Sequence, residues 1–318
     1  SPSVYGSSCR VLARTEPFGD RDCTMVPYHA HHMFSFFVLA LAAIHRGTCV
    51  KLTNVAREID CLQKESLGKV FQSTLSKLHS SSFSTLDLHQ KRRTSCPPVR
   101  LIDPPRTRLT LGNLLHDIGL HGIGVEVGVQ RGRFMRSVLE GWQHAALYIQ
   151  VDLWEEQQQY LDRANVNAQR QMDNMNVSCM EARQAKQHRL VDEVVQCKDF
   201  SVACAKLIPD RSVEFIYIDA RHDRKGVLED LQAFWPKLRE GGVMAGHDYM
   251  EQYEIPNGQH WEMNYDGTKD ESRRVVRGAV NDFFGGIIQE SPQDLKECPR
   301  QPVITYREDK WNTWLVRK

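Results

Sequence analysis

The stretch GVEVGVQRG, residues 124–132, decides the fold of this chain. Its first part, residues 124–129, is a short apolar run of the kind that forms a buried strand. Gly128 and Gly132 allow the backbone to turn closely, and a helix is expected over residues 134–140. Open α/β sheets bind their ligands at such turns from a strand into a helix.

The alternation of strands and helices continues beyond this stretch. Further strands are expected at residues 146–152, 213–218 and 243–246, the last after a helix that Gly241 and Gly242 bring to an end. We therefore predict an α/β fold built on a doubly wound, mostly parallel Rossmann-like sheet.

The two ends of the chain depart from this pattern. Residues 303–306 and 311–316 predict a C-terminal antiparallel hairpin at one sheet edge, and residues 52–78 carry apolar side chains at helical spacing, which predicts a helical N-terminal extension. The expected organisation has three parts: an N-terminal segment (1–48), a helical region with a Ser- and Pro-rich linker (49–108) and the sheet domain (109–318).

A continuous apolar run at residues 33–44 bears on the compartment. It is shorter than the ~20 residues that a membrane helix needs, so no stable membrane span is expected. Its length suits a signal peptide if Met33 is the start of the natural protein, and a buried helix otherwise. A cytoplasmic location is expected in the second case and the secretory pathway in the first.

Charge and cysteine usage limit the partners and the redox setting. The chain has 41 basic and 40 acidic side chains, a net charge of +1, so no sustained positive field favours nucleic acid. The nine cysteines show no C-x-x-C pair and no zinc-site spacing, and we expect them to be mostly reduced. Nothing in the sequence indicates the oligomeric state.

The turn at residues 128–132 has the features of a nucleoside-cofactor site. Asp152 ends the next strand twenty residues after Gly132, where a carboxylate can accept hydrogen bonds from ribose hydroxyls. A nicotinamide dinucleotide site would need G-x-G-x-x-G, and its middle glycine is absent. Glu126 suits the positive charges of S-adenosylmethionine better than a pyrophosphate, although such a turn also serves close packing alone.

Four ordered motifs resemble the class I S-adenosylmethionine-dependent methyltransferases, of the methyltransferase-domain type related to sugar and macrolide O-methyltransferases. They are GVEVGVQRG at 124–132, VDLW at 151–154, YIDARH at 217–222 and GGVMAGHDY at 241–249, within a resemblance that covers residues 111–318. An antiparallel strand at the end of the sheet is also characteristic of that family.

The resemblance implies a role for each matching position. Glu126 and the 128–132 backbone would hold the methionine part, Asp152 the ribose and the segment Asp199-Phe200-Ser201 the adenine. Asp199 also suits the N-cap of a following helix. The full set of implied cofactor residues is Glu126, Gly128, Val129, Gln130, Gly132, Asp152, Leu153, Asp199, Phe200 and Asp219.

Two carboxylates and two imidazoles follow adjacent strands: Asp219 with His222, and His247 with Asp248. We expect these four catalytic residues on one rim. Asp219, His247 and Asp248 can hold Mg²⁺ or another divalent cation that activates a hydroxyl. Alternatively, His222 or His247 acts as a general base without a metal. Where related enzymes carry an acidic pair, position 247 is a histidine, which shifts the preference towards a softer ion.

The expected reaction is O-methylation of a small hydroxylated acceptor of the sugar or phenol type. The Asp/Asn-Pro-Pro-aromatic loop of base-methylating enzymes is absent after the strand that ends at Asp219. Residues 249–274 are the expected acceptor lid, and residues 155–189 the expected cover over the cofactor. A nicotinamide-dependent Rossmann oxidoreductase and a non-catalytic relative that binds cofactor or a partner remain the alternatives.

Overall fold

A computed structural model describes residues 64–80, 102–256, 258–308 and 311–318, all within the compact unit that spans 57–318. The apolar run at 33–44, the first part of the predicted helix at 52–78 and most of the predicted linker lie outside the described residues. Helix α2 (Lys64–Ser80) confirms the helical prediction over the part that is described.

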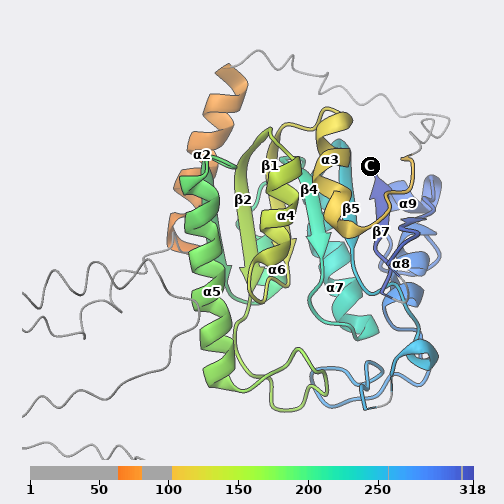
Figure 1. The fold of residues 1–318 in the computed structure, drawn as a ribbon. Helices are drawn as coiled ribbons and strands as arrows, with labels where there is room; N and C mark the ends of the chain where they lie inside the picture. Colours follow the sequence, from red (N-terminus) through yellow and green to blue (C-terminus); the bar gives the residue numbers. More distant parts are fainter. Residues whose placement is uncertain (1–63, 81–101, 257, 309–310) are drawn as a thin grey trace, which may run out of the picture. The chain divides into compact units, whose positions relative to one another are not determined.

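Seven strands form one sheet in the order β3-β2-β1-β4-β5-β7-β6 (Figure 1). The first five are parallel, and β7 runs antiparallel to β5 and to β6. The doubly wound sheet with its C-terminal antiparallel pair is therefore confirmed. The strands are β1 (Gly122–Val127), β2 (Ala145–Asp152), β3 (Glu193–Lys198), β4 (Val213–Ile218), β5 (Leu238–Gly246), β6 (Val303–Ile304) and β7 (Trp314–Arg317).

Helices cover both faces of the sheet, because strand side chains alternate between the faces and both sets are apolar. Ile123, Val125 and Val127 of β1 belong to one core cluster and Tyr148 of β2 to the other. The first cluster includes α2, α6 (Ser201–Ala205), α7 (Arg224–Phe234), α8 (Val276–Phe284) and α9 (Gln293–Glu297). The second includes α3 (Leu111–Asp117), α4 (Arg133–Gly141) and α5 (Ala168–Gln187).

The helix before β5 ends differently from the prediction. It stops at Phe234 and continues as a short 3₁₀ turn, Trp235–Lys237, that contains Pro236. Proline lacks the amide hydrogen that would extend the helix, so Pro236 ends it. Gly241, with φ +80°, lies inside β5, so the prediction that the glycine pair breaks the helix was wrong.

The cysteine prediction was also wrong for the part of the chain that the structure describes. Cys197 and Cys204 form a disulfide, and Cys179 and Cys298 are disulfide-bonded as well. The end of β3 and the start of α6 bring Cys197 and Cys204 to a Cα–Cα distance of 6.1 Å. The sequence shows no sign of this approach, because it depends on the chain reversing between β3 and α6.

No helix among the described residues is long and apolar enough to cross a membrane.

Candidate active site

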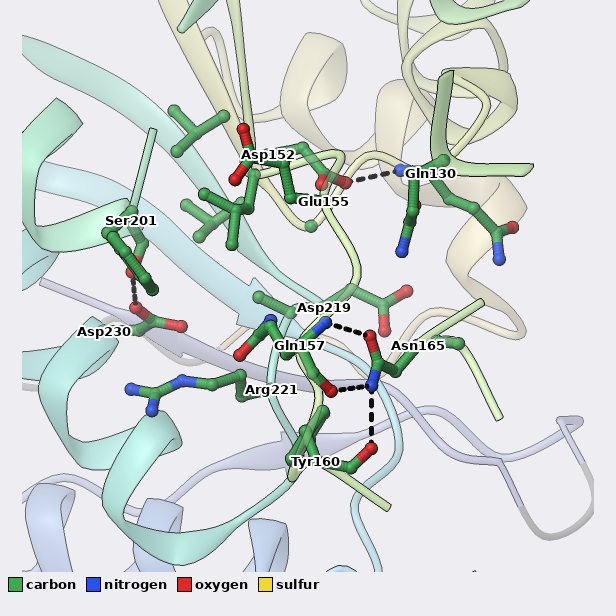
Figure 2. A pocket seen from close by; sticks show the side chains of 18 of the residues that line it. Gln130, Asp152, Glu155, Gln157, Tyr160, Asn165, Ser201, Asp219, Arg221 and Asp230 are labelled. Carbon is green, nitrogen blue, oxygen red and sulfur yellow. Dashed lines mark hydrogen bonds between the residues drawn. The ribbon is translucent and has the colours of Figure 1, made fainter. Parts of the chain in front are cut away.

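A cavity opens at the carboxyl ends of β1, β2 and β4, with a volume of about 800 Å³ including its open mouth (Figure 2). Parallel strands β1, β2 and β4 are neighbours in the sheet, so their ends deliver side chains to one edge. The volume is within the range of small-molecule and cofactor sites.

The turn after β1 is shaped by backbone conformations that glycine tolerates. Gly128 and Gly132 have φ angles of +86° and +70°. At Gly128 an added Cβ would lie 2.0 Å from the carbonyl oxygen of Asp219, because the turn runs directly against the end of β4. Glycine at 128 is therefore required by both conformation and space.

Asp152 at the end of β2 holds this turn in place. Its Oδ2 accepts hydrogen bonds from the amides of Val129 and Gln130, each at 2.8 Å, and its Oδ1 accepts one from the Trp154 amide at 2.8 Å. Burial raises the pKa of Asp152, and these backbone amides partly offset that rise. The acid thus shapes the loop under the cavity besides facing the cavity itself.

Most of the predicted cofactor residues line this cavity, and three do not. Those that do are Gly128, Gln130, Asp152, Leu153, Asp199, Phe200 and Asp219. Glu126, Val129 and Gly132 are not among its lining residues. Asp199 is not the N-cap of α6, a position that Phe200 takes, and its Oδ1 accepts a hydrogen bond from the Phe200 amide.

Glu126 lies beneath the turn, almost fully buried in β1. Its Oε2 has no hydrogen-bond partner among the described residues. Burial raises the pKa of Glu126 well above its usual value, and the nearby carboxylate of Asp219 raises it further. A positively charged group close to Glu126 would therefore stabilise its ionised form.

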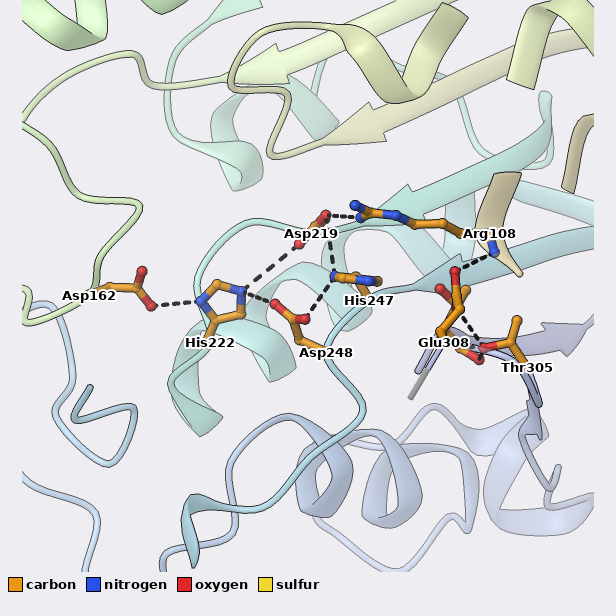
Figure 3. A network of polar contacts seen from close by, with 9 residues as sticks. Arg108, Asp162, Asp219, His222, His247, Asp248, Thr305 and Glu308 are labelled. Carbon is orange, nitrogen blue, oxygen red and sulfur yellow. Dashed lines mark hydrogen bonds and ion pairs between the residues drawn. The ribbon is translucent and has the colours of Figure 1, made fainter. Parts of the chain in front are cut away.

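The four predicted catalytic residues lie together beside the cavity (Figure 3). His222 Nε2 is 2.9 Å from Asp248 Oδ2 and 3.9 Å from Asp219 Oδ1. His247 Nδ1 is 2.7 Å from Asp248 Oδ1 and 3.9 Å from Asp219 Oδ2. Asp219 thus belongs to both places: it lines the cavity and closes the cluster.

Sequence reasoning missed three residues that surround His222. The Asp162 carboxylate lies 2.7 Å from His222 Nδ1, and the Tyr160 hydroxyl accepts a hydrogen bond from the His222 amide at 2.7 Å. The Trp261 indole stacks on the His222 ring at 4.1 Å between centroids. They come from irregular segments without periodicity, so no pattern could have placed them there.

Arg108 was missed as well, on the far side of Asp219. Its Nη1 lies 3.4 Å from Asp219 Oδ2. Its backbone amide donates to Glu308, which also accepts from the Thr305 hydroxyl at 2.6 Å. The segment before α3 and the β6–β7 connection therefore support the position of Asp219 together (Figure 3).

The carboxylates decide the charge of the two histidines. Burial alone would lower the pKa of His222, but hydrogen bonds with Asp162, Asp219 and Asp248 raise it well above its usual value. Burial likewise opposes the rise in the pKa of His247 that Asp248 and Asp219 produce. Although burial acts to raise the pKa of Asp248, the two imidazoles hold it well below its usual range.

One ligand atom each from Asp219, His247 and Asp248 lies within 4.8 Å of the other two. A divalent ion could therefore contact all three side chains after small rotamer adjustments. Two carboxylates with one imidazole suit Mn²⁺, Fe²⁺ or Zn²⁺ better than Mg²⁺, which prefers oxygen ligands only.

The two segments expected to cover the site are mostly irregular. Residues 153–167 precede α5 and line the cavity through Gln157, Tyr160 and Asn165, so the expected helical cover begins only at Ala168. Of the aromatics at residues 249–274, Trp261 is buried against His222, whereas Tyr253 is 76% exposed.

Comparison with known proteins gives one family match. Residues 125–249 match a family model described as a methyltransferase domain, which covers β1 to the end of β5 and both clusters of site residues. No curated protein matches the chain significantly.

Solved structures of similar shape include three that illustrate the range. A Corynebacterium glutamicum protein is 11% identical at a TM-score of 0.41, covering 89% of this chain and 96% of its own. An O-methyltransferase from Bacillus cereus in complex with SAH is 15% identical at 0.38, covering 88% and 97%. An O-methyltransferase family protein from Burkholderia thailandensis is 9% identical at 0.36, covering 66% and 55%. All three scores lie below 0.5, so the assignment rests on the family match and the sheet topology.

Proposed function

We propose that this chain, which carries a class I S-adenosylmethionine-dependent methyltransferase domain, transfers a methyl group to a hydroxyl oxygen of a small acceptor of the sugar or phenol type. One observation carries the proposal. Asp219 lines the nucleoside-sized cavity and also lies within 3.9 Å of both histidines of the neighbouring cluster. Donor and acceptor sites would therefore meet at this side chain.

The residues around the cavity fit S-adenosylmethionine. The oxygen of Glu126 without a partner would favour the ammonium or sulfonium charge nearby, and Asp152 can accept from the ribose hydroxyls with its remaining lone pairs. When bound, the cofactor supplies an electrophilic methyl group on a positively charged sulfur. The turn at Gly128 would position that sulfur next to Asp219.

The acceptor hydroxyl must lose its proton as the new oxygen–carbon bond forms. His222 has a carboxylate at each ring nitrogen, so it is held as an imidazolium and is a poor base. We therefore assign His222 to orienting Asp248, and the proton to Asp219 or His247. If a divalent ion binds Asp219, His247 and Asp248, it would instead lower the pKa of the bound hydroxyl.

The decisive experiment combines binding and turnover. Calorimetry with S-adenosylhomocysteine should give a saturable isotherm with one site, whereas NAD should give none. Turnover is then sought with labelled S-adenosylmethionine and a panel of catechols, phenols and glycosides, with and without added Mg²⁺, Mn²⁺ or EDTA. Saturable binding of NAD without binding of S-adenosylhomocysteine would reverse the assignment.

Two variants test the reacting cluster. Asp219→Ala and Asp248→Ala should lower turnover at least about 100-fold while S-adenosylhomocysteine still binds. Asp210→Ala is the matched control, since Asp210 is exposed and pairs only with Lys237 among its described contacts. Wild-type turnover in either cluster variant would refute the roles given to Asp219 and Asp248.

A further inference from the structure

One buried carboxylate lines the cavity but has no part in the proposed function. Asp230 of α7 is fully buried and belongs to the cavity wall. The Ser201 hydroxyl donates a hydrogen bond to its Oδ1, while Oδ2 has no hydrogen-bond partner among the described residues (Figure 2). Buried carboxylate oxygens are rarely left without a donor, so Oδ2 is suited to a donor on a bound molecule.

The surroundings of Asp230 provide no cation that satisfies this oxygen. Arg221 is the nearest positive group, but its guanidinium pairs with Glu229 and lies 4.8 Å from the centre of the Tyr265 ring. Burial raises the pKa of Asp230 to about 7, against the opposing effects of Ser201 and Arg221. Above that pH the side chain is an ionised acceptor at the cavity wall.

The geometry of the cavity indicates which part of the cofactor reaches Asp230. If the ribose lies on Asp152 and the sulfur beside Asp219, the base must occupy the remaining side, against Phe200 and Ser201. Phe200 is 51% exposed, which leaves an aromatic face available for stacking on a base. Ser201 follows Phe200 directly, and its hydroxyl is the group that binds Asp230.

We propose that Asp230 accepts a hydrogen bond from the 6-amino group of the cofactor's adenine and so sets the base specificity of this enzyme. Ser201 is the positioning residue, because its hydrogen bond fixes which carboxylate oxygen faces the base. This inference rests on the proposed function and adds the group that recognises the base. Hypoxanthine carries a carbonyl oxygen in place of the amino group, and that oxygen would face the Asp230 carboxylate without a hydrogen between them.

The first test needs no variant. Calorimetry at pH 8, above the pKa of Asp230, compares S-adenosylhomocysteine with S-inosylhomocysteine on the wild-type protein. The adenine compound should bind about 10- to 100-fold more tightly, the usual range for losing a hydrogen bond to a charged group. Equal affinities would overturn this inference and leave the proposed function intact. Failure of both compounds to bind would overturn the proposed function and this inference with it.

A variant then assigns the discrimination to one side chain. Asp230→Asn keeps the shape but can present its amide N–H₂ to a carbonyl, so the preference for adenine should fall towards one or reverse. Glu229→Gln, at the preceding position of α7, should keep the wild-type ratio, and so should Asp199→Asn. A wild-type ratio in folded Asp230→Asn, or its loss in Asp199→Asn instead, would refute the assignment to Asp230.

Discussion

Replacing Gly128 by alanine should abolish cofactor binding, and replacing Gly241 by alanine should not. Both glycines have a left-handed backbone, with φ of +86° and +80°. At Gly241 the added Cβ would have no atom within 4 Å, whereas at Gly128 it would lie 2.0 Å from the Asp219 carbonyl oxygen. The pair therefore shares the conformational strain and differs only in the contact.

The expected magnitudes follow from that difference. A left-handed alanine costs roughly 1–2 kcal/mol, which both variants should lose in free energy of unfolding. At Gly128 the Cβ must also move away by about 1 Å to reach a normal contact distance of at least 3.0 Å. Either the turn or the end of β4 must then shift, and both line the cavity. We expect the Kd for S-adenosylhomocysteine to rise at least about 100-fold in Gly128→Ala, since misplacement on this scale can cost that much.

Thermal unfolding and calorimetry with S-adenosylhomocysteine measure both effects on the same samples. Gly241→Ala should lose stability and retain the wild-type Kd. Wild-type affinity in Gly128→Ala would show that the approach of this turn to β4 does not shape the cofactor site.

Two further predictions concern stability. Burial raises the pKa of Glu214 to about 7, above its unfolded value, so its contribution to stability is complete below about pH 4.5 and is lost as pH rises through 7. Urea unfolding of Glu214→Gln against wild type should accordingly show the variant gaining up to about 3 kcal/mol in relative stability from pH 5 to pH 8, and a constant difference would contradict this. The Cys197–Cys204 disulfide closes the short segment that carries Phe200 and Ser201. Replacing both cysteines by alanine should lower the free energy of unfolding by about 2–3 kcal/mol and weaken binding of S-adenosylhomocysteine, and unchanged affinity would mean that the bridge does not order that segment.

The sheet was predictable because its strands are buried on both faces and read as uninterrupted apolar runs. GVEVGVQRG and the strand that ends at Asp219 were located in this way, and the structure places them side by side as β1 and β4. The boundary before β5 was less predictable, since Pro236 and the glycine pair both disfavour a helix and only packing decides between them. The family match over residues 125–249 covers the same strands.

The site was predictable only where its residues follow strands. Asp219, His222, His247 and Asp248 share one edge because parallel strands end there. Asp162 and Trp261 reach His222 from irregular segments about 60 and 39 positions away along the chain, and their approach depends on tertiary packing alone. Asp230 looked like an ordinary helical residue, because its burial follows from the face that α7 turns to the sheet.

A crystal structure of the protein with S-adenosylhomocysteine would test the central claim most directly. The account predicts the ribose hydroxyls on Asp152, the thioether sulfur beside Asp219 and the adenine between Phe200 and Asp230. A nucleoside bound elsewhere, or bound with its sulfur turned away from Asp219, would contradict it, because the methyl group could not then reach an acceptor held by His247 and Asp248.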